Sequence, residues 1–244
     1  MTDSVHLVFG ATSGMAPALA RRLLAAGARL VLAARRPEAL AGLAAETGAR
    51  LLAVDARDFD AVRAAAEETA REEGRLDGMV NLAGSLLLKP AHLTSADEYR
   101  AVLDANLTTA FAVVRAAGTV LRKTGGAVVL ISSAAARIGF ANHEAIAAAK
   151  AGVQGLVLSA AASYGAARIR INAVAPGLVR TPLSARLVGT KEGEDRSAAM
   201  HAIGRIGEPD DVAAAIAWLL DPAQGFVTGQ VLGVDGGLGV VRSR

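Results

Sequence analysis

The sequence predicts an α/β fold in which a doubly wound parallel sheet of seven strands carries helices on both faces. Seven short apolar runs alternate with longer helical stretches along the 244 residues. The runs are hydrophobic almost without interruption, which is typical of strands buried on both faces of a parallel sheet. Parallel neighbours need crossover connections, and the helical stretches supply them. The predicted strands cover residues 5–9, 28–34, 49–54, 78–83, 126–132, 169–175 and 230–235.

Helical stretches separate these strands. The first, residues 17–27, has Pro17 at its first helical position and Gly27 just beyond its last turn. Those are the positions that favour proline and glycine in helices. Two longer helices are predicted over residues 58–74 and 95–123.

A further helix is predicted to begin within NHEAIAAAK, residues 142 to 150. Asn142 is the expected N-cap, because its side chain can accept hydrogen bonds from the first turn. Glu144 stands where the helix dipole favours negative charge. Lys150 is the one lysine on an otherwise apolar stretch, and its role is the main question that this sequence raises.

Composition narrows the classes of protein. Hydrophobic residues make up 52% of the chain, and no linker or internal repeat divides it, so residues 1–244 are predicted to form one domain. The net charge is +3, but the basic residues are scattered, and no nucleic-acid partner is expected. The absence of cysteine excludes disulfides and Cys-based metal sites, so no metal is expected and a cytoplasmic location is favoured. Neither a signal peptide nor an uncharged apolar stretch of membrane-spanning length is recognisable, so no membrane partner is expected.

The first junction between a strand and a helix, VFGATSGMAPALA, carries two glycines with a functional interpretation. Gly10 and Gly14 follow a strand and precede a helix. Glycines there permit a tight turn and let backbone N–H groups approach a pyrophosphate at the helix N-terminus. An ordinary glycine turn is the alternative interpretation of these two residues.

The spacing Gly10-x-x-x-Gly14-x-Ala16 resembles the Gly-x-x-x-Gly-x-Gly loop of the short-chain dehydrogenase/reductase family. Two departures are Phe9, where the family often has threonine, and Ala16, which replaces the third glycine. The resemblance extends over essentially the whole chain and implies a Rossmann-type fold that binds a nicotinamide cofactor. It also implies that the cofactor contacts include Gly10, Thr12, Ser13, Gly14 and Met15 of this loop.

Other segments match the family in order and spacing. Asp55, with Ala56, would bind the adenine amino group, and Asn106 matches the asparagine that interrupts a helix and orders a proton-relay water. The resemblance also extends to residues 205–220 and 228–237. It implies further contacts beside the ribose from Asn81, Ala83 and Gly84, and around the nicotinamide from Pro176, Gly177, Val179 and Thr181.

The end of the second predicted strand bears on the choice of nicotinamide cofactor. A site for NAD(H) usually has a carboxylate there, which accepts hydrogen bonds from the ribose hydroxyls. In this sequence the position is occupied by Ala34, and Arg35 follows it. A small neutral residue leaves room for a 2′-phosphate, and a guanidinium binds phosphate through charge-assisted hydrogen bonds. The resemblance therefore predicts NADP(H) rather than NAD(H). The alternative is that Arg35 and Arg36 are solvated surface charges.

The family resemblance also explains why Lys150 matters. In that family a serine, a tyrosine and a lysine converge on the substrate carbonyl, in a Tyr-x-x-x-Lys pattern with serine 13 residues before the tyrosine. Lys150 and Ser133 have this spacing, and Asn106 is also present. The position of the tyrosine is occupied by Ile146, which has no proton to give.

His143 is the best substitute for the missing acid. It lies three residues before Ile146, on the same helix face, and an imidazole has a pKa suited to proton donation near neutral pH. The alternative is that His143 is a solvent-facing residue of the first turn. Tyr164, about 21 Å beyond Lys150 along a continuous helix, and Tyr99, on a different helix, are poor candidates. Glu144 is interpreted as a helix-dipole partner.

Two functions remain open at this stage. One is an NADP(H)-dependent oxidoreductase that reduces a carbonyl, an imine or an activated C=C bond with a proton donor other than tyrosine, or with a proton from water. The other is a pseudo-enzyme that binds the cofactor as a sensor or partner subunit. Residues 85–93 predict an apolar substrate wall, and residues 183–204 a mobile lid. The resemblance implies a homotetramer, or a dimer, in which helices 97–123 and 143–165 pair across a two-fold axis.

Overall fold

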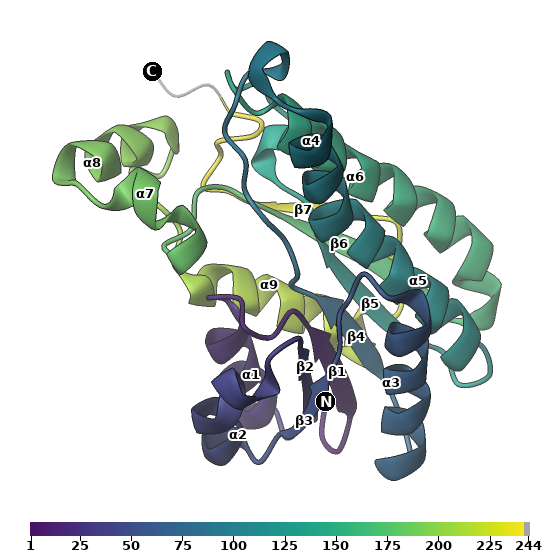
Figure 1. Cartoon of the computed structure of the whole chain (residues 1–244). Coiled ribbons are helices and arrows are strands. Elements are labelled where there is room, and N and C mark those ends of the chain that lie inside the picture. Colours follow the sequence, from purple (N-terminus) through teal and green to yellow (C-terminus); the bar gives the residue numbers. More distant parts are fainter. Residues whose placement is uncertain (242–244) are drawn as a thin grey trace.

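A seven-stranded parallel sheet forms the centre of the protein, as the sequence predicts (Figure 1). The computed structural model describes residues 1–241. The strand order is β3-β2-β1-β4-β5-β6-β7, so the direction in which the chain builds the sheet reverses between β1 and β4. Each predicted strand corresponds to an observed one, with ends that differ by two residues at most. The strands are Val5–Phe9 (β1), Arg29–Ala34 (β2), Arg50–Ala53 (β3), Gly78–Asn81 (β4), Gly126–Ile131 (β5), Ile169–Pro176 (β6) and Val231–Val234 (β7).

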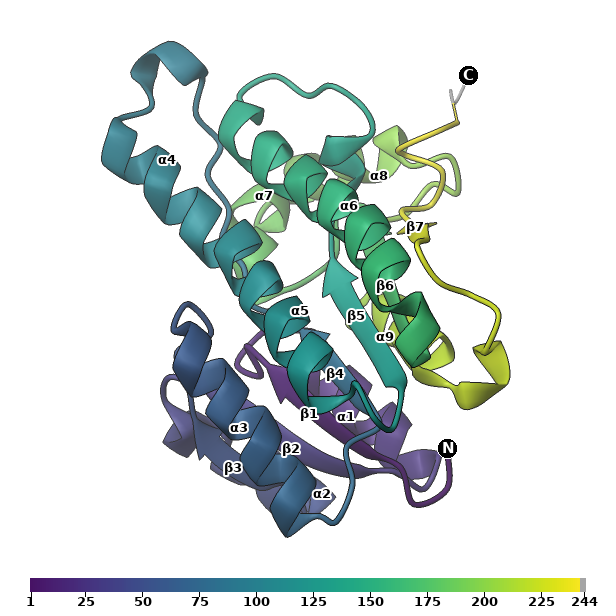
Figure 2. The ribbon, with the colours of Figure 1, turned by 90° about the vertical axis from the view of Figure 1, so that its right-hand side faces the viewer.

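Helices cover both faces of this sheet (Figures 1 and 2). On one face lie Ala16–Ala25 (α1), Ala41–Thr47 (α2) and Pro209–Leu220 (α9). The other face carries Phe59–Glu72 (α3), Ala96–Leu103 (α4), Thr109–Val120 (α5) and Glu144–Tyr164 (α6). Two short helices, Ala185–Val188 (α7) and Lys191–Met200 (α8), project beyond the strand ends.

Burial on both faces accounts for the continuous hydrophobicity of the strands. In β1, Val5, Leu7 and Phe9 join the cluster that also includes side chains of α3, α5 and α6. Val8 of the same strand joins the cluster on the side of α1 and α9. Successive side chains of a strand point to opposite faces, so a strand between two helical layers needs apolar residues at nearly every position.

Three sequence predictions about helices are wrong in detail. The helix predicted over 95–123 is interrupted by a π-helical turn at Asp104–Thr108 and ends at Val120. Asn142 is not the N-cap of α6, because its backbone is left-handed (φ 64°) and the N-cap position belongs to His143. Pro17 occupies the second rather than the first position of α1, because the N-cap is Met15.

One helix of the described chain, Glu144–Ala167, is long and apolar enough to cross a membrane by composition alone. Its buried face includes Val153 and Val157, which belong to the same core cluster as residues of β5 and β6. The length and hydropathy of α6 are therefore those of a core helix.

A histidine is buried within the sheet. His6 of β1 is 1% exposed, and its Nε2 lies 2.9 Å from the hydroxyl oxygen of Ser4. Within residues 1–241, its Nδ1 has no hydrogen-bond partner. Burial lowers the pKa of His6 to about 4, despite the opposing effect of the Asp77 carboxylate. The folded protein therefore favours the neutral imidazole.

From the lowered pKa of His6 we predict that the free energy of unfolding decreases in acid. Because its pKa is lower in the folded state than in the unfolded state, unfolding takes up a proton below about pH 6.5. The free energy of unfolding should fall by about 3 kcal/mol as pH decreases from 6.5 to below 4. Urea titrations at several pH values should show that His6→Gln removes this part of the pH dependence. The matched control is the exposed His92→Gln, and equal pH profiles for the two variants would contradict the prediction.

Candidate active site at the carboxyl ends of the strands

A cavity of about 760 Å³ opens at the carboxyl ends of the strands, next to the reversal between β1 and β4. Parallel α/β sheets place their ligand sites at this position. Segments that follow each of the seven strands line it. The predicted site residues that line it are Gly10, Thr12, Ser13, Gly14, Met15, Arg35, Asp55, Ala56, Ala83, Gly84, Asn106, Ser133, His143, Lys150, Pro176, Gly177, Val179 and Thr181.

Asn81 is the exception among the predicted site residues. Its side chain is 2% exposed and does not line the cavity. Instead, its Oδ1 accepts from Ala83 N–H at 3.1 Å, and its Nδ2 donates to the hydroxyl of Thr109 at 3.0 Å. These two hydrogen bonds of Asn81 fix the loop after β4 and connect it to the first residue of α5.

The loop between β1 and α1 forms a cradle that needs its two glycines. Gly10 has a left-handed backbone (φ 66°), and a Cβ atom there would overlap the backbone nitrogen of Ala83. A Cβ on Gly14 would lie 2.7 Å from Cδ of Pro182. The cradle leads into the N-terminus of α1, where free N–H groups and the helix dipole favour an anion such as a diphosphate.

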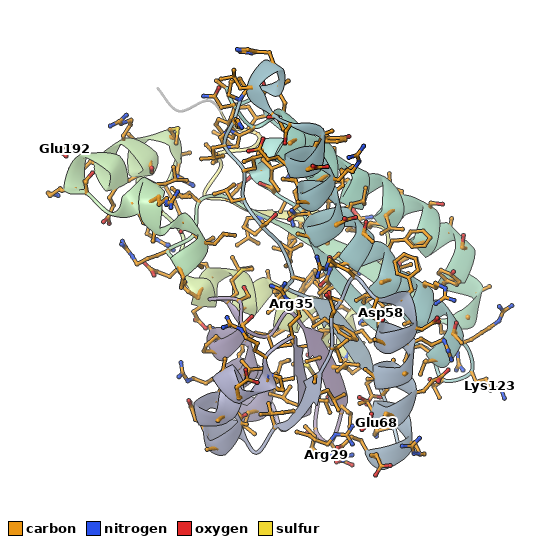
Figure 3. All side chains as sticks on the ribbon, in the orientation of Figure 1. Arg29, Arg35, Asp58, Glu68, Lys123 and Glu192 are labelled. Atoms are coloured by element: carbon orange, nitrogen blue, oxygen red, sulfur yellow. The ribbon has the colours of Figure 1, made fainter. Side chains whose placement is uncertain are left out.

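Charged side chains gather at the β2–β3 end of the cavity. Arg35 follows β2 and, in Figure 3, lies above the strand ends near the centre of the molecule, whereas Lys123 and Glu192 lie at its periphery. Asp55 follows β3, and its carboxylate pairs with Arg57 at 2.6 Å. Hydrogen bonds from Arg57 lower the pKa of Asp55 to about 2, and the charge of Arg35 adds to this effect.

Arg57 is a cavity residue that sequence reasoning missed. The one local signal for Arg57 is its position two residues after Asp55. In a loop, an aspartate and an arginine at this spacing can form an ion pair with each other, which would place Arg57 beside Asp55. With Arg35 and Arg57 together, this end of the cavity holds two guanidinium groups and one carboxylate.

Asn106 lies in the π-helical turn between α4 and α5, where it is 1% exposed. Its Nδ2 donates to the carbonyl of Val102 at 2.9 Å and to the hydroxyl of Ser85 at 3.1 Å. Its Oδ1 accepts from Ser85 N–H at 3.3 Å. A side chain that bonds both its own helix and the loop after β4 explains why the helix is interrupted at this point.

Lys150 reaches the cavity from α6 and is 7% exposed. Its Nζ donates to the carbonyl of Ile131, at the end of β5, at 2.8 Å. Burial lowers the pKa of Lys150 to about 8, because the charged amine is partly removed from water.

Two neighbouring serines after β5 have different surroundings. The hydroxyl of Ser132 donates to the carbonyl of Lys150 at 3.0 Å and is buried against α6. Ser133 lines the cavity, and its oxygen accepts from Ala135 N–H at 3.1 Å. That bond uses an acceptor site and leaves the hydroxyl hydrogen of Ser133 available to a ligand.

At the position one helical turn before Lys150, the cavity wall is hydrocarbon. Ile146 is 4% exposed and packs in an apolar cluster with Val102 and Ala149. His143, half-buried at the start of α6, lines the same cavity. Its Nδ1 lies 2.8 Å from the carbonyl of Ala141, so Nδ1 carries a hydrogen and Nε2 is the nitrogen that can exchange a proton.

Neither tyrosine lines the cavity. Tyr164 is the last residue of α6 and packs its ring against Gly118 of α5, and Tyr99 is 43% exposed on α4. Both segments predicted to border the substrate contribute to the cavity wall, which is apolar at this end. Its side chains include Leu86, Leu88, Phe140, Leu183, Leu187, Met200 and Leu238.

The chain is similar to known oxidoreductases. A protein family described as Enoyl-(Acyl carrier protein) reductase matches residues 10–239. Cis-4-hydroxycyclohexanecarboxylate dehydrogenase of Sinomonas cyclohexanicum is 39% identical over 241 residues, which cover 96% of each chain. A short-chain type dehydrogenase/reductase from Mycobacterium ulcerans superposes with a TM-score of 0.93 at 34% identity, over 100% of this chain and 92% of the other. A structure of ElxO with NADP bound has a TM-score of 0.90 at 26% identity, over 97% and 99% of the two chains.

The buried amine of Lys150 should titrate near pH 8. The sequence has only four lysines, so their ¹³Cε signals can be followed individually by NMR in protein labelled at that carbon. The signal that disappears in Lys150→Met should shift with a midpoint near pH 8, well below the value of about 10.4 for a solvated lysine. A midpoint above pH 10 for that signal would show that the amine is solvated and not held in the cavity wall.

Proposed function

Because the chain belongs to the short-chain dehydrogenase/reductase family, we propose that it is an NADP(H)-dependent oxidoreductase that reduces a small, apolar carbonyl, imine or activated C=C compound. The observation that carries this proposal is the shared cavity of the glycine cradle, Lys150 and Ser133. Binding a nucleotide needs only the cradle and the lysine. The hydroxyl hydrogen of Ser133 is left over from its bond with Ala135 and can donate to a polar group of a substrate.

The residues of the cavity fit a nicotinamide cofactor with a 2′-phosphate. The cradle tolerates no side chain at Gly10 or Gly14, because a Cβ atom there would collide with Ala83 or Pro182, and a backbone turn of this kind at a helix N-terminus suits a diphosphate. Arg35 and Arg57 offer guanidinium groups at the adenosine end, where they suit a phosphate better than a ribose hydroxyl. Lys150 has one N–H bonded to Ile131 and further donors for the nicotinamide ribose. When bound, the cofactor supplies or accepts the hydride.

The chain's own residues would position the substrate and supply its proton. The hydroxyl of Ser133 donates to the substrate oxygen and polarises the double bond. The proposed proton donor is Nε2 of His143, because the carbonyl of Ala141 accepts from Nδ1–H in both protonation states and holds the ring. Asn106 keeps the loop after β4 in place and, with it, the wall that faces the substrate.

A pseudo-enzyme remains the second candidate, because of one specific observation. Ile146 is packed in hydrocarbon at the position where the family has its catalytic tyrosine, and a general acid typically contributes about 10²- to 10⁴-fold in rate. Loss of that acid with retention of the cradle is what a cofactor-binding sensor would show. Turnover of NADPH against a panel of ketones, imines and enones distinguishes the two functions.

The apolar wall supports an uncharged substrate. Leucines at 86, 88, 183 and 187 line this end of the cavity, and its basic groups are Lys150 and His143 near the reacting centre. A carboxylate on the far side of the substrate would lose water there without gaining a cation, which costs several kcal/mol. Compounds with a neutral ring or alkyl group are therefore the first to test.

For its assembly, we propose a homotetramer, or a dimer, that pairs α4 and α5 with α6 across a two-fold axis, in a cytoplasmic protein. The exposed face of α6 carries small residues at Ala151, Gly155 and Ala162, which allow close approach of a second helix. Leu158 of α6 is 62% exposed and Phe111 of α5 is 49% exposed, and both are apolar. Water-exposed apolar residues of this size on adjoining helices support a subunit interface.

Arg35 should set the cofactor preference. Arg35→Ala should weaken binding of NADP(H) by about tenfold or more, because a charge-assisted bond to the 2′-phosphate is lost, and leave binding of NAD(H) almost unchanged. Arg36→Ala is the matched control, because Arg36 is exposed and does not line the cavity. Dissociation constants from fluorescence titration decide the matter: equal losses for both cofactors, or tighter binding of NAD(H) by the unchanged protein, would exclude the NADP(H) assignment.

His143 should control the rate of reduction and not the binding of NADPH. His143→Ala should lower turnover by about 10²-fold, because the imidazole would no longer deliver the proton to the substrate. Ile146→Tyr is the converse variant, because it places a phenol four residues before Lys150 and 13 after Ser133. A gain of ketone reduction in Ile146→Tyr, with none in the parent and no effect of His143→Ala, would favour the pseudo-enzyme.

The assembly should depend on the exposed face of α6. Leu158→Glu places a charge at the centre of the proposed interface and should shift the light-scattering mass towards the monomer at micromolar concentration. Leu24→Glu is the control, because Leu24 is 41% exposed on α1, on the opposite face of the sheet. A monomeric parent protein would contradict the proposal directly.

A further inference from the structure

His201 lies outside the proposed catalytic group and is almost fully buried, with an exposed fraction of 3%. It directly follows α8, the helix that contributes Ser197 and Met200 to the cavity wall. The imidazole uses both of its nitrogens. Its Nδ1 lies 2.8 Å from the carbonyl of Ser197, and its Nε2 lies 3.2 Å from the backbone nitrogen of Leu178.

These two bonds fix the protonation of the ring. The Ser197 carbonyl can only accept, so Nδ1 must carry the hydrogen. The backbone N–H of Leu178 can only donate, so Nε2 must be bare. The neutral Nδ1–H tautomer is the one form of histidine that satisfies both partners.

The ring joins two separate walls of the cavity. One is the last turn of α8, in which the ring binds the carbonyl of Ser197. The other is the segment after β6, in which Pro176, Gly177 and Leu178 all line the cavity. The contact is close, because a Cβ atom on Gly177 would lie 2.7 Å from Nε2 of His201.

The charged groups around the ring are already engaged. The carboxylate of Asp235 accepts from Gly237 N–H and Gly239 N–H, both at 3.0 Å. Arg205 pairs with Asp211 at 2.6 Å. On α8 itself, Glu194 pairs with Arg180 at 2.6 Å, and Arg180 also reaches Glu208, so a surface ion pair restrains the same helix.

We propose that His201 is a positioning residue that latches α8 onto the backbone of Leu178 and thereby holds the lid closed over the nicotinamide end of the cavity. The inference rests on the proposed cofactor site for its functional meaning, but the latch itself is a property of the chain alone. The latch needs a bare Nε2, because an Nε2–H group would face the N–H of Leu178, and two buried donors cannot satisfy each other.

Two substitutions separate the latch from a simple packing role. His201→Gln keeps an amide oxygen that can accept from Leu178 N–H but cannot gain a proton. His201→Leu keeps apolar volume and removes both hydrogen bonds. Neither variant changes a residue that lines the cavity.

The first measurement is amide hydrogen exchange at Leu178 and across α8 in the protein without cofactor, corrected for the intrinsic effect of pH. At pH 7.5, exchange should be at least about fivefold faster in His201→Leu than in the parent, and nearly unchanged in His201→Gln. Equal protection of Leu178 in the parent and His201→Leu, or equal loss of protection in His201→Leu and His201→Gln, would overturn the latch. If His201→Leu does not fold, loss of protection at Leu178 in His201→Gln, which keeps the acceptor, would still overturn it.

The second measurement locates the effect within the cavity. His201→Leu should weaken binding of NADPH and leave binding of 2′,5′-ADP, which lacks the nicotinamide half, unchanged. Equal weakening of both ligands would show that His201 acts on the whole fold and would overturn the assignment. A parent protein that binds neither ligand would refute the proposed function, while the exchange data would still establish or exclude the latch.

Discussion

The close contact between the ends of β1 and β4 is the constraint on which the rest of the site depends. Gly10 can lie against the backbone of Ala83 only because it has no side chain and a left-handed backbone. This contact lies where the strand order reverses, so the chain that follows β1 turns one way and the chain that follows β4 turns the other. The cavity opens between them. Asn81 and Asn106 then fix the loop after β4 through backbone bonds, and the helices above the sheet are placed relative to that loop.

The strands were predictable from sequence because their signal is local. Burial on both faces demands apolar residues at nearly every position, and each strand satisfies that demand within its own few residues. The cradle and most cavity residues were expected from the family resemblance, and most of them lie together because they follow the ends of parallel strands. The structure gives the positions of these residues, whereas their roles in binding and chemistry are proposals.

What the sequence could not predict depends on partners far away in the chain. The interruption of the helix at Asn106 requires its bonds to Ser85, which is 21 residues earlier. His201 gave no signal, because its partner Leu178 is 23 residues away and is a backbone N–H group rather than a recognisable side chain. Asn142 was misread because its capping propensity is local, whereas its left-handed backbone is imposed by the loop that also returns its carbonyl to Lys89 N–H.

The state of Lys150 shows what the loss of a tyrosine at position 146 means physically. With a pKa of about 8, its amine is mostly protonated at pH 7, so it can still hold an anionic or hydroxyl-rich ligand. Beside a phenol, such a charge would lower the pKa of the phenol and prepare it for proton transfer. Beside Ile146 the charge has no phenol to activate. The proposed proton donor is therefore a separate side chain of the same cavity, His143, which lies three residues before Ile146 and has its Nδ1 held by the carbonyl of Ala141.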